Sequence, residues 1–381
     1  MNPRNKRILW LIALVLIVAL VWFGRHHIHF NWTVFVEQIR QADWHRIVLG
    51  LACIYCGYIL RGYRWARLMR HKEKLPPFSL VGTQVMGFTA VALIGRVADL
   101  SRPYLVAKKT GQPLTSQIAV YIVERLFDFG AMGLIAFSVI AFSPAGVLPH
   151  PEIVRRAGFW GLGLTLAGGL FLLAVRLAGE KVASMLGGAL AVISAKAGQA
   201  AEKKIRTFHA GLDTIRTFSD FAIVGASSLI MWMLIALAYL LTLRAFIASP
   251  PLAAMTPARA VLLMIFSGGV SALQLPILGW FTQIGFVAAA IGNFFGASPE
   301  ASLGCAAALL LVTFLGIVPV GLAWARFDRV SLIKVVEESE HAGEALAHHA
   351  PEEPPRRVSI RAASALLAAC SVARIPGSRH T

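Results

Sequence analysis

Long apolar runs separated by short basic stretches constrain this chain more than any other feature. Each run is long enough, or nearly so, to cross the hydrocarbon core of a bilayer as a helix, whose backbone hydrogen bonds are satisfied internally. The 381 residues are 57% hydrophobic and 14% charged, which excludes an ordinary soluble domain and predicts an all-α polytopic membrane protein. The runs lie near residues 8–24, 47–60, 79–95, 117–142, 157–175, 221–243, 259–276, 281–297 and 303–324.

The basic residues predict how the runs are oriented. The net charge of +17 would suit a nucleic-acid partner, but the lysines and arginines cluster between the apolar runs. Such clustering is typical of the cytoplasmic side of a membrane protein, so we expect no nucleic-acid binding. By this rule the N-terminus, the segment 61–74 and the loop 180–216 are cytoplasmic.

The run 79–95 conflicts with this rule if it crosses the bilayer completely, because the loop 180–216 would then lie outside. A re-entrant hairpin at 79–95 removes the conflict, and Gly82, Gly87 and Gly95 allow the helix to break there. The stretch 259–324 fits three crossings, or one crossing plus a second hairpin. We therefore predict about eight transmembrane helices, one or two re-entrant hairpins, and cytoplasmic N- and C-termini.

The sequence also indicates where the membrane domain ends. Residues 1–327 form the predicted transmembrane domain. Within it, 195–218 has apolar residues at helical spacing and fits an amphipathic helix on the cytoplasmic surface. Residues 328–381 are rich in glutamate, proline and arginine and predict a disordered cytoplasmic tail.

Three charged residues interrupt the apolar run 117–142. Glu124 and Asp128 are four residues apart and share one helical face, with Arg125 beside them. Charge is costly in hydrocarbon, so such residues face a bundle interior or a watery cavity. Two interpretations remain open, namely a polar site that handles a charged group and an ion-pair network that only holds helices together.

Two further basic segments predict the rest of the site. Arg61 and Arg64 end the second apolar run, where their spacing also fits an ordinary juxtamembrane anchor. Arg96, Asp99 and Arg102 follow the predicted hairpin. Arginine suits phosphate, because its planar fork donates paired hydrogen bonds. The predicted substrate-binding residues are Arg61, Arg64, Arg96, Asp99, Arg102, Glu124, Arg125 and Asp128.

At these residues the chain resembles the flippase-like membrane family related to the N-terminal transmembrane domain of lysylphosphatidylglycerol synthases. The likeness lies in the segments Arg61–Trp65, Gly95–Pro103 and Glu124–Asp128, in this order and spacing. Ala98 and Asp99 depart from the family pattern, which often has Gly and Glu there. The resemblance implies translocation of a lipid across the bilayer.

The likeness covers roughly the first 327 residues, and the soluble synthase domain of the larger relatives is missing, so we expect no lysyl transfer. No nucleophile–base pair, metal-ligand set or phosphate loop is present in the sequence, so we expect neither an enzyme nor a cofactor. The leading hypothesis is a flippase for a lipid with an anionic or phosphate-bearing headgroup, in the cytoplasmic (inner) membrane of a prokaryote. The alternatives are an accessory or scaffold protein for a lipid-modifying enzyme, and an ion- or proton-coupled solute transporter. The sequence leaves the oligomeric state open.

Overall fold

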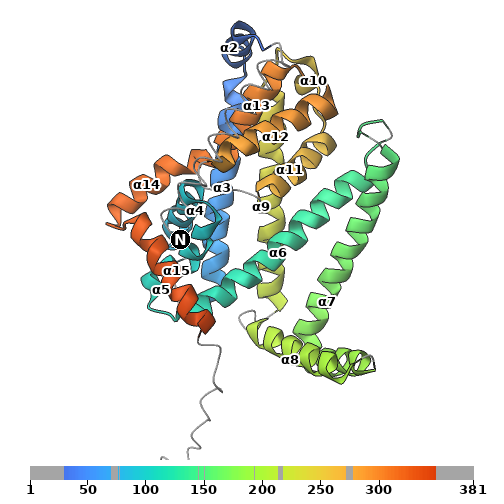
Figure 1. The fold of residues 1–381 in the computed structure, drawn as a ribbon, viewed down its shortest axis with the longest axis vertical. Coiled ribbons are helices and arrows are strands. Elements are labelled where there is room, and N and C mark those ends of the chain that lie inside the picture. The colour runs from blue at the N-terminus through green and yellow to red at the C-terminus, as the bar shows by residue number, and fades with distance from the viewer. Residues whose placement is uncertain are drawn as a thin grey trace, which may run out of the picture. The chain divides into compact units, whose positions relative to one another are not determined.

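The computed structural model describes residues 30–69, 76, 78–144, 146–149, 151–192, 194–212, 218–271 and 278–348, apart from a few side chains within helices. The first predicted span, 8–24, lies outside them. The described residues form helices and no strands, which confirms the all-α class (Figure 1). The helices are α2 (Trp32–Arg40), α3 (Trp44–Met69), α4 (Val81–Ile94), η1 (Arg96–Leu100), α5 (Ser101–Thr110), α6 (Leu114–Ala141), α7 (Pro151–Ala191), α8 (Ala195–Leu212), α9 (Phe218–Arg244), α10 (Pro250–Ala253), α11 (Pro257–Ser271), α12 (Leu278–Phe295), α13 (Pro299–Thr313), η2 (Leu315–Ile317), α14 (Val318–Phe327) and α15 (Leu332–His348).

An antiparallel pair, α3 and α9, forms the centre of the helical unit. At one end, the Asp43 amide donates to the Ala245 carbonyl at 2.8 Å, and Arg46 donates to the Arg244 carbonyl at 2.7 Å. At the other end, Arg67 pairs with Asp220 at 2.9 Å. We call these the α2 end and the α5 end, after the helices found there.

Two short-helix hairpins pack on this pair. In the first hairpin, α4 turns at Gly95, whose φ of 98° favours glycine, and the chain returns through η1 and α5. The Lys109 ammonium donates to the Ser79 carbonyl at 2.8 Å, so the hairpin starts and finishes at the α5 end. The 14 residues of α4 span about 21 Å at about 1.5 Å per residue, less than the roughly 30 Å of a hydrocarbon core.

The second hairpin consists of α11 and α12 and starts from the α2 end. The Arg259 guanidinium, near the start of α11, lies 6.0 Å from the centroid of the Phe295 ring at the end of α12. The two hairpins meet where the Trp280 indole donates to the Ala92 carbonyl at 3.1 Å. Near this contact α4 ends and α12 begins.

Fewer helices than expected are long and apolar enough to cross a membrane. Among the described residues these are Trp44–Met69 and Ser219–Arg244, or up to four spans if two bent helix pairs each count as one. One of those pairs joins α13 to η2 and α14 with a bend of 44°. Helix α6 has 28 residues, but it is not counted as an apolar span because it contains the charged residues Glu124, Arg125 and Asp128. Length and composition thus support an α-helical membrane protein, and the described residues contain two to four of the about eight predicted spans.

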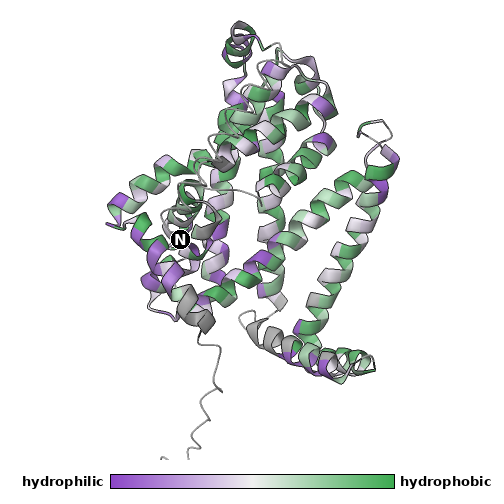
Figure 2. Ribbon diagram, viewed as in Figure 1, coloured by the Kyte–Doolittle hydropathy of each residue, from purple (hydrophilic) through white to green (hydrophobic). Residues whose placement is uncertain are grey.

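Hydrophobic residues run along α7 and α9, whereas hydrophilic residues gather towards helix ends and on α5 (Figure 2). Helix α8, within the predicted amphipathic segment, packs along the second half of α7. The end of the chain starts as a helix, because α15 occupies the beginning of the segment that we expected to be disordered. Leu332 and Val335 of α15 are buried against Met86 and Leu105 of the first hairpin. Residues 341–381 form a separate unit, of which 341–348 are described.

Candidate functional site

Arg64 is the centre of a buried ionic cluster between α3, α6 and α9. Its residue is 1% exposed. One guanidinium nitrogen donates to Asp128 Oδ1 at 2.6 Å and to Ser228 Oγ at 2.5 Å, and the other donates to Glu124 Oε1 at 2.6 Å. Because Glu124 and Asp128 share one face of α6, a single planar guanidinium reaches both carboxylates.

Arg102 brings the first hairpin to the same carboxylate. Its Nη2 donates to Glu124 Oε1 and Oε2 at 2.9 and 3.0 Å. Its Nε and Nη2 also donate to the Gln84 amide oxygen at 3.1 and 2.7 Å. The guanidinium carbon lies 4.2 Å from the Phe88 ring centroid and 5.4 Å from that of Trp65, which are distances for cation–π attraction.

Glycine at position 87 leaves room for the Arg102 side chain. A Cβ atom at this position would lie 2.5 Å from Arg102 Cγ. Two residues of α4 therefore fix the position of Arg102. Gln84 accepts its hydrogen bonds, and Gly87, about one turn later, allows its side chain to approach the helix.

Arg61 and Arg125 form the outer part of the cluster and are held less firmly. Arg61 Nη1 lies 3.6 Å from Asp128 Oδ2 and 3.8 Å from Glu124 Oε1, and makes no hydrogen bond within the described residues. Arg125 Nη2 lies 3.1 Å from Asp128 Oδ2 and 3.3 Å from Glu124 Oε1, while its Nε likewise has no partner there. The exposed fractions of these side chains, 11% and 31%, exceed the 1% of Arg64 and Arg102.

The cluster has more positive than negative charge. We define the arginine cluster as Arg61, Arg64, Arg102 and Arg125 with the carboxylates Glu124 and Asp128. Asp99, which is half-buried in η1, also attracts Arg125 at longer range. Four guanidinium groups against three carboxylates leave one excess positive charge in the described part of the site. An unmatched buried charge is expensive, so this arrangement suits an anion as an additional partner.

The structure thus brings six of the eight predicted site residues together and places Asp99 beside them. The side chain of Arg96 lies outside the described part of the chain. The sequence interpretation missed Gln84, Ser228 and the aromatic residues around Arg102, although Gln84 lies in an apolar run where a polar side chain is itself a signal. Within the described ranges, no three His, Cys, Asp or Glu side chains are grouped as a metal site would require.

Comparisons with known proteins agree with the resemblance found in the sequence. A family model described as the lysylphosphatidylglycerol synthase TM region matches residues 10–321, which is most of the chain. No curated protein matches significantly, and no solved structure does either.

Proposed function

Because this chain belongs to the lysylphosphatidylglycerol synthase TM region family, we propose that it moves lipids with a phosphate-bearing headgroup across the bilayer. The family indicates a membrane protein concerned with lipid modification or lipid transport. The arginine cluster favours transport of a charged headgroup. The proposal gives the described residues a role in binding and translocation, and none in catalysis.

The observation that carries this proposal is the unequal bonding of the four arginines. Arg64 and Arg102 are fully buried, and their hydrogen bonds to Glu124 and Asp128 neutralise both carboxylates. Arg61 Nη1, Arg125 Nε and also Arg64 Nε lack hydrogen-bond partners in the described structure, but only Arg61 and Arg125 are partly exposed, at 11% and 31% against 1% for Arg64. In this proposal the first two arginines position the site, and the second two receive the phosphate.

Hydrogen-bond chemistry supports this division of roles. A phosphate oxygen accepts from several guanidinium donors at once, and such charge-assisted bonds are about twice as strong as neutral ones. The charge of one phosphodiester equals the excess charge of the cluster when Asp99 is counted. The acyl chains would remain in the bilayer, beside the exposed apolar surface of α6 and α7.

The two hairpins offer a path for the headgroup. We propose that both re-enter the membrane, the first from the cytoplasmic side and the second from the outside, and that they meet at the Trp280–Ala92 contact. Irregular backbone at membrane depth requires surrounding protein or water. We propose that the protein lies in the cytoplasmic membrane of a prokaryote, with both termini in the cytoplasm.

Lipid translocation in reconstituted vesicles tests the proposal. The assay follows fluorescent phosphatidylglycerol, whose label in the outer leaflet is destroyed by an impermeant reductant, and uses a phosphate-free diacylglycerol with the same chains as the comparison. We expect protein-dependent movement of phosphatidylglycerol, and at least tenfold slower movement with R61Q/R125Q, because each lost charge-assisted bond is worth about 1.5–3 kcal/mol.

The matched control is R326Q/K334Q, which removes two exposed positive charges at the same end of the molecule. It should translocate at the wild-type rate. Wild-type rates for a correctly folded R61Q/R125Q would contradict the proposal and return the cluster to a purely structural role. Transport that depends on a partner protein would instead favour the accessory function, and uptake of a soluble substrate driven by pH would favour the coupled transporter.

A further inference from the structure

A second polar site lies at the α2 end, away from the arginine cluster. A half-open cavity of about 320 Å³ lies between the end of α6 and the start of α7. Its apolar wall includes Ile140, Leu148 and Phe159. The Val147 carbonyl accepts a hydrogen bond from Arg259 of α11 at 2.6 Å, which fixes the loop on one side of the cavity.

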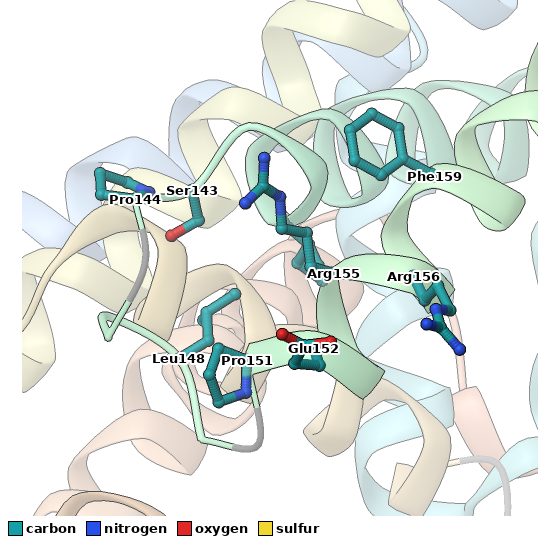
Figure 3. Close-up of a pocket in the computed structure, with 9 residues that line it drawn as sticks. Ser143, Pro144, Leu148, Pro151, Glu152, Arg155, Arg156 and Phe159 are labelled. Carbon is teal, nitrogen blue, oxygen red and sulfur yellow. The ribbon is translucent and has the colours of Figure 1, made fainter.

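Two neighbouring arginines give the cavity its charge. Arg155 and Arg156 of α7 line it together with Glu152, which leaves one excess positive charge (Figure 3). In Figure 3 the Arg155 guanidinium lies between Ser143 and Phe159. Unlike the arginines of the cluster, neither Arg155 nor Arg156 has an ion pair or hydrogen bond among the described residues.

A buried hydroxyl group provides independent evidence for a ligand. Ser143 lines the cavity and is 8% exposed, and its Oγ has no hydrogen-bond partner in the described structure. A buried polar atom without a partner costs free energy, so such atoms in native structures usually contact a water or a ligand. The Ser143 hydroxyl and the free Arg155 guanidinium are donors suited to an anion with several oxygens, such as a phosphate. The Arg156 guanidinium points away from them in Figure 3 and adds positive charge at the rim of the cavity.

The surroundings of the cavity indicate a lipid as the source of that phosphate. Phe142, Ile153 and Trp160 are each more than two-thirds exposed next to it. Exposed apolar side chains with a tryptophan are typical of a surface at the edge of the hydrocarbon core. The volume of the cavity suits a headgroup, while the acyl chains would lie along this outer surface.

The position along α6 relates this cavity to the arginine cluster. Asp128 and Ile140 both belong to α6, and at about 1.5 Å per residue they are roughly 18 Å apart along the helix. That separation exceeds half of a hydrocarbon core of roughly 30 Å. We propose that this cavity binds the phosphate of a lipid headgroup from the leaflet opposite the arginine cluster. Binding here stands on its own, whereas a role as the release site for transported lipid rests on the proposed function.

Native mass spectrometry of the full chain, titrated with phosphatidylglycerol, tests this inference. We expect wild type to retain two lipids, and R155Q/R156Q to lose one of them with about tenfold weaker affinity. E152Q should bind that lipid several-fold more tightly, because it removes a negative charge from the cavity. R40Q, an exposed substitution at the same end, should behave as wild type.

Two ligand comparisons identify what is bound. A diacylglycerol with the same chains should not occupy the site, because it lacks the phosphate. Displacement by soluble glycerol phosphate at the concentration of the lipid would identify a site for free phosphate compounds, and no displacement would identify a lipid site. Equal lipid affinity of wild type, R155Q/R156Q and E152Q would overturn the inference. Its failure is distinct from that of the proposed function, which fails if R61Q/R125Q still translocates lipid.

Discussion

The two hairpins share an architecture but differ in the chemistry of their buried polar groups. The first hairpin places a charged residue, Arg102, against Glu124 of α6 at 2.9 Å. The second contains a neutral set, in which Ser267 accepts from the Tyr239 hydroxyl at 3.0 Å and from the Gln283 amide at 3.3 Å. Within the described structure, only the first of the two hairpins contributes a fully buried charged side chain.

This difference indicates separate roles for the two hairpins. A neutral hydrogen-bonded set needs no external counter-ion and can hold α11, α12 and α9 together at modest cost. The ionic set around Arg102 is not electrically neutral, because its excess positive charge has no counter-ion in the described structure. We infer that the first hairpin supports ligand binding and that the second mainly supports packing.

Removal of the central carboxylate should have the largest effect. Glu124→Ala leaves Arg64 and Arg102 buried without their shared partner, and breaking a buried ion pair from one side costs about 3–5 kcal/mol. We expect a loss of that size in the free energy of unfolding, measured by denaturant titration in detergent micelles.

Glu340→Ala is the matched control, since this exposed glutamate of α15 makes no ion pair in the described structure. Its effect should stay within about 0.5 kcal/mol. Equal stability of the two variants would show that the cluster is not the main electrostatic determinant of the fold.

Alanine substitution of one glycine in each hairpin tests how tightly that hairpin is packed. At Gly82, in α4, a Cβ atom would lie 2.3 Å from the Trp324 ring, whereas nothing lies within 4 Å of such an atom at Gly268 of α11. Gly82→Ala should cost about 1–3 kcal/mol through overpacking. Gly268→Ala should be neutral or stabilise by up to about 1 kcal/mol through helix propensity. The same unfolding titration measures both, and the reverse order would contradict the close contact between α4 and α14.

Substitutions in the neutral hydrogen-bonded set of the second hairpin should lower the free energy of unfolding by a smaller amount. Ser267→Ala removes the acceptor shared by Tyr239 and Gln283 and should cost about 1 kcal/mol. A double-mutant cycle with Tyr239→Phe isolates the hydrogen bond between the two residues. We expect lipid translocation to continue at the wild-type rate in both variants, and a loss comparable to that of R61Q/R125Q would remove the distinction between the hairpins.

The smallest effect concerns the contact between α15 and the first hairpin. The Tyr104 hydroxyl donates to Glu338 at 2.7 Å, with Lys108 at 3.5 Å, and both lower the pKa of this exposed carboxyl. A lowered folded-state pKa means that the contact contributes fully above the ordinary carboxyl pKa and is lost as the pH falls through the folded value. The protection of backbone amides around Glu338 against hydrogen exchange, corrected for the intrinsic pH dependence of exchange, should therefore fall modestly at acidic pH. E338Q should show no such step, and a step of equal size in E338Q would assign it to another group.

Local pattern predicted the parts of the site that lie on one helix. Glu124 and Asp128 share a face because of their spacing, and Arg64 contacts both. The depth of Arg64 was not predictable, because a position near a helix end equally fits an anchor at the membrane surface. Its burial depends on α6 and α9, which are distant in the sequence.

The sequence left open whether the stretch 259–297 crosses the membrane or forms a second hairpin. The runs 259–276 and 281–297 are each apolar enough to resemble a crossing, and only the approach of Arg259 to Phe295 reveals that α11 and α12 form a hairpin. The first hairpin was predicted within 79–95, but α4 runs unbroken from Val81 to Ile94 past Gly82 and Gly87, the chain turns at Gly95, and it returns through η1 and α5. Its re-entry from the cytoplasmic side stays a prediction. The cytoplasmic location of the termini stays a prediction.

The most direct test of the account is a cryo-electron microscopy structure in nanodiscs that contain phosphatidylglycerol. The account predicts phosphate density within hydrogen-bond distance of Arg61 Nη1 and Arg125 Nε, and its loss in R61Q/R125Q. A cluster without phosphate density in these nanodiscs, in which Arg61 Nη1 and Arg125 Nε are hydrogen-bonded to protein groups alone, would contradict it.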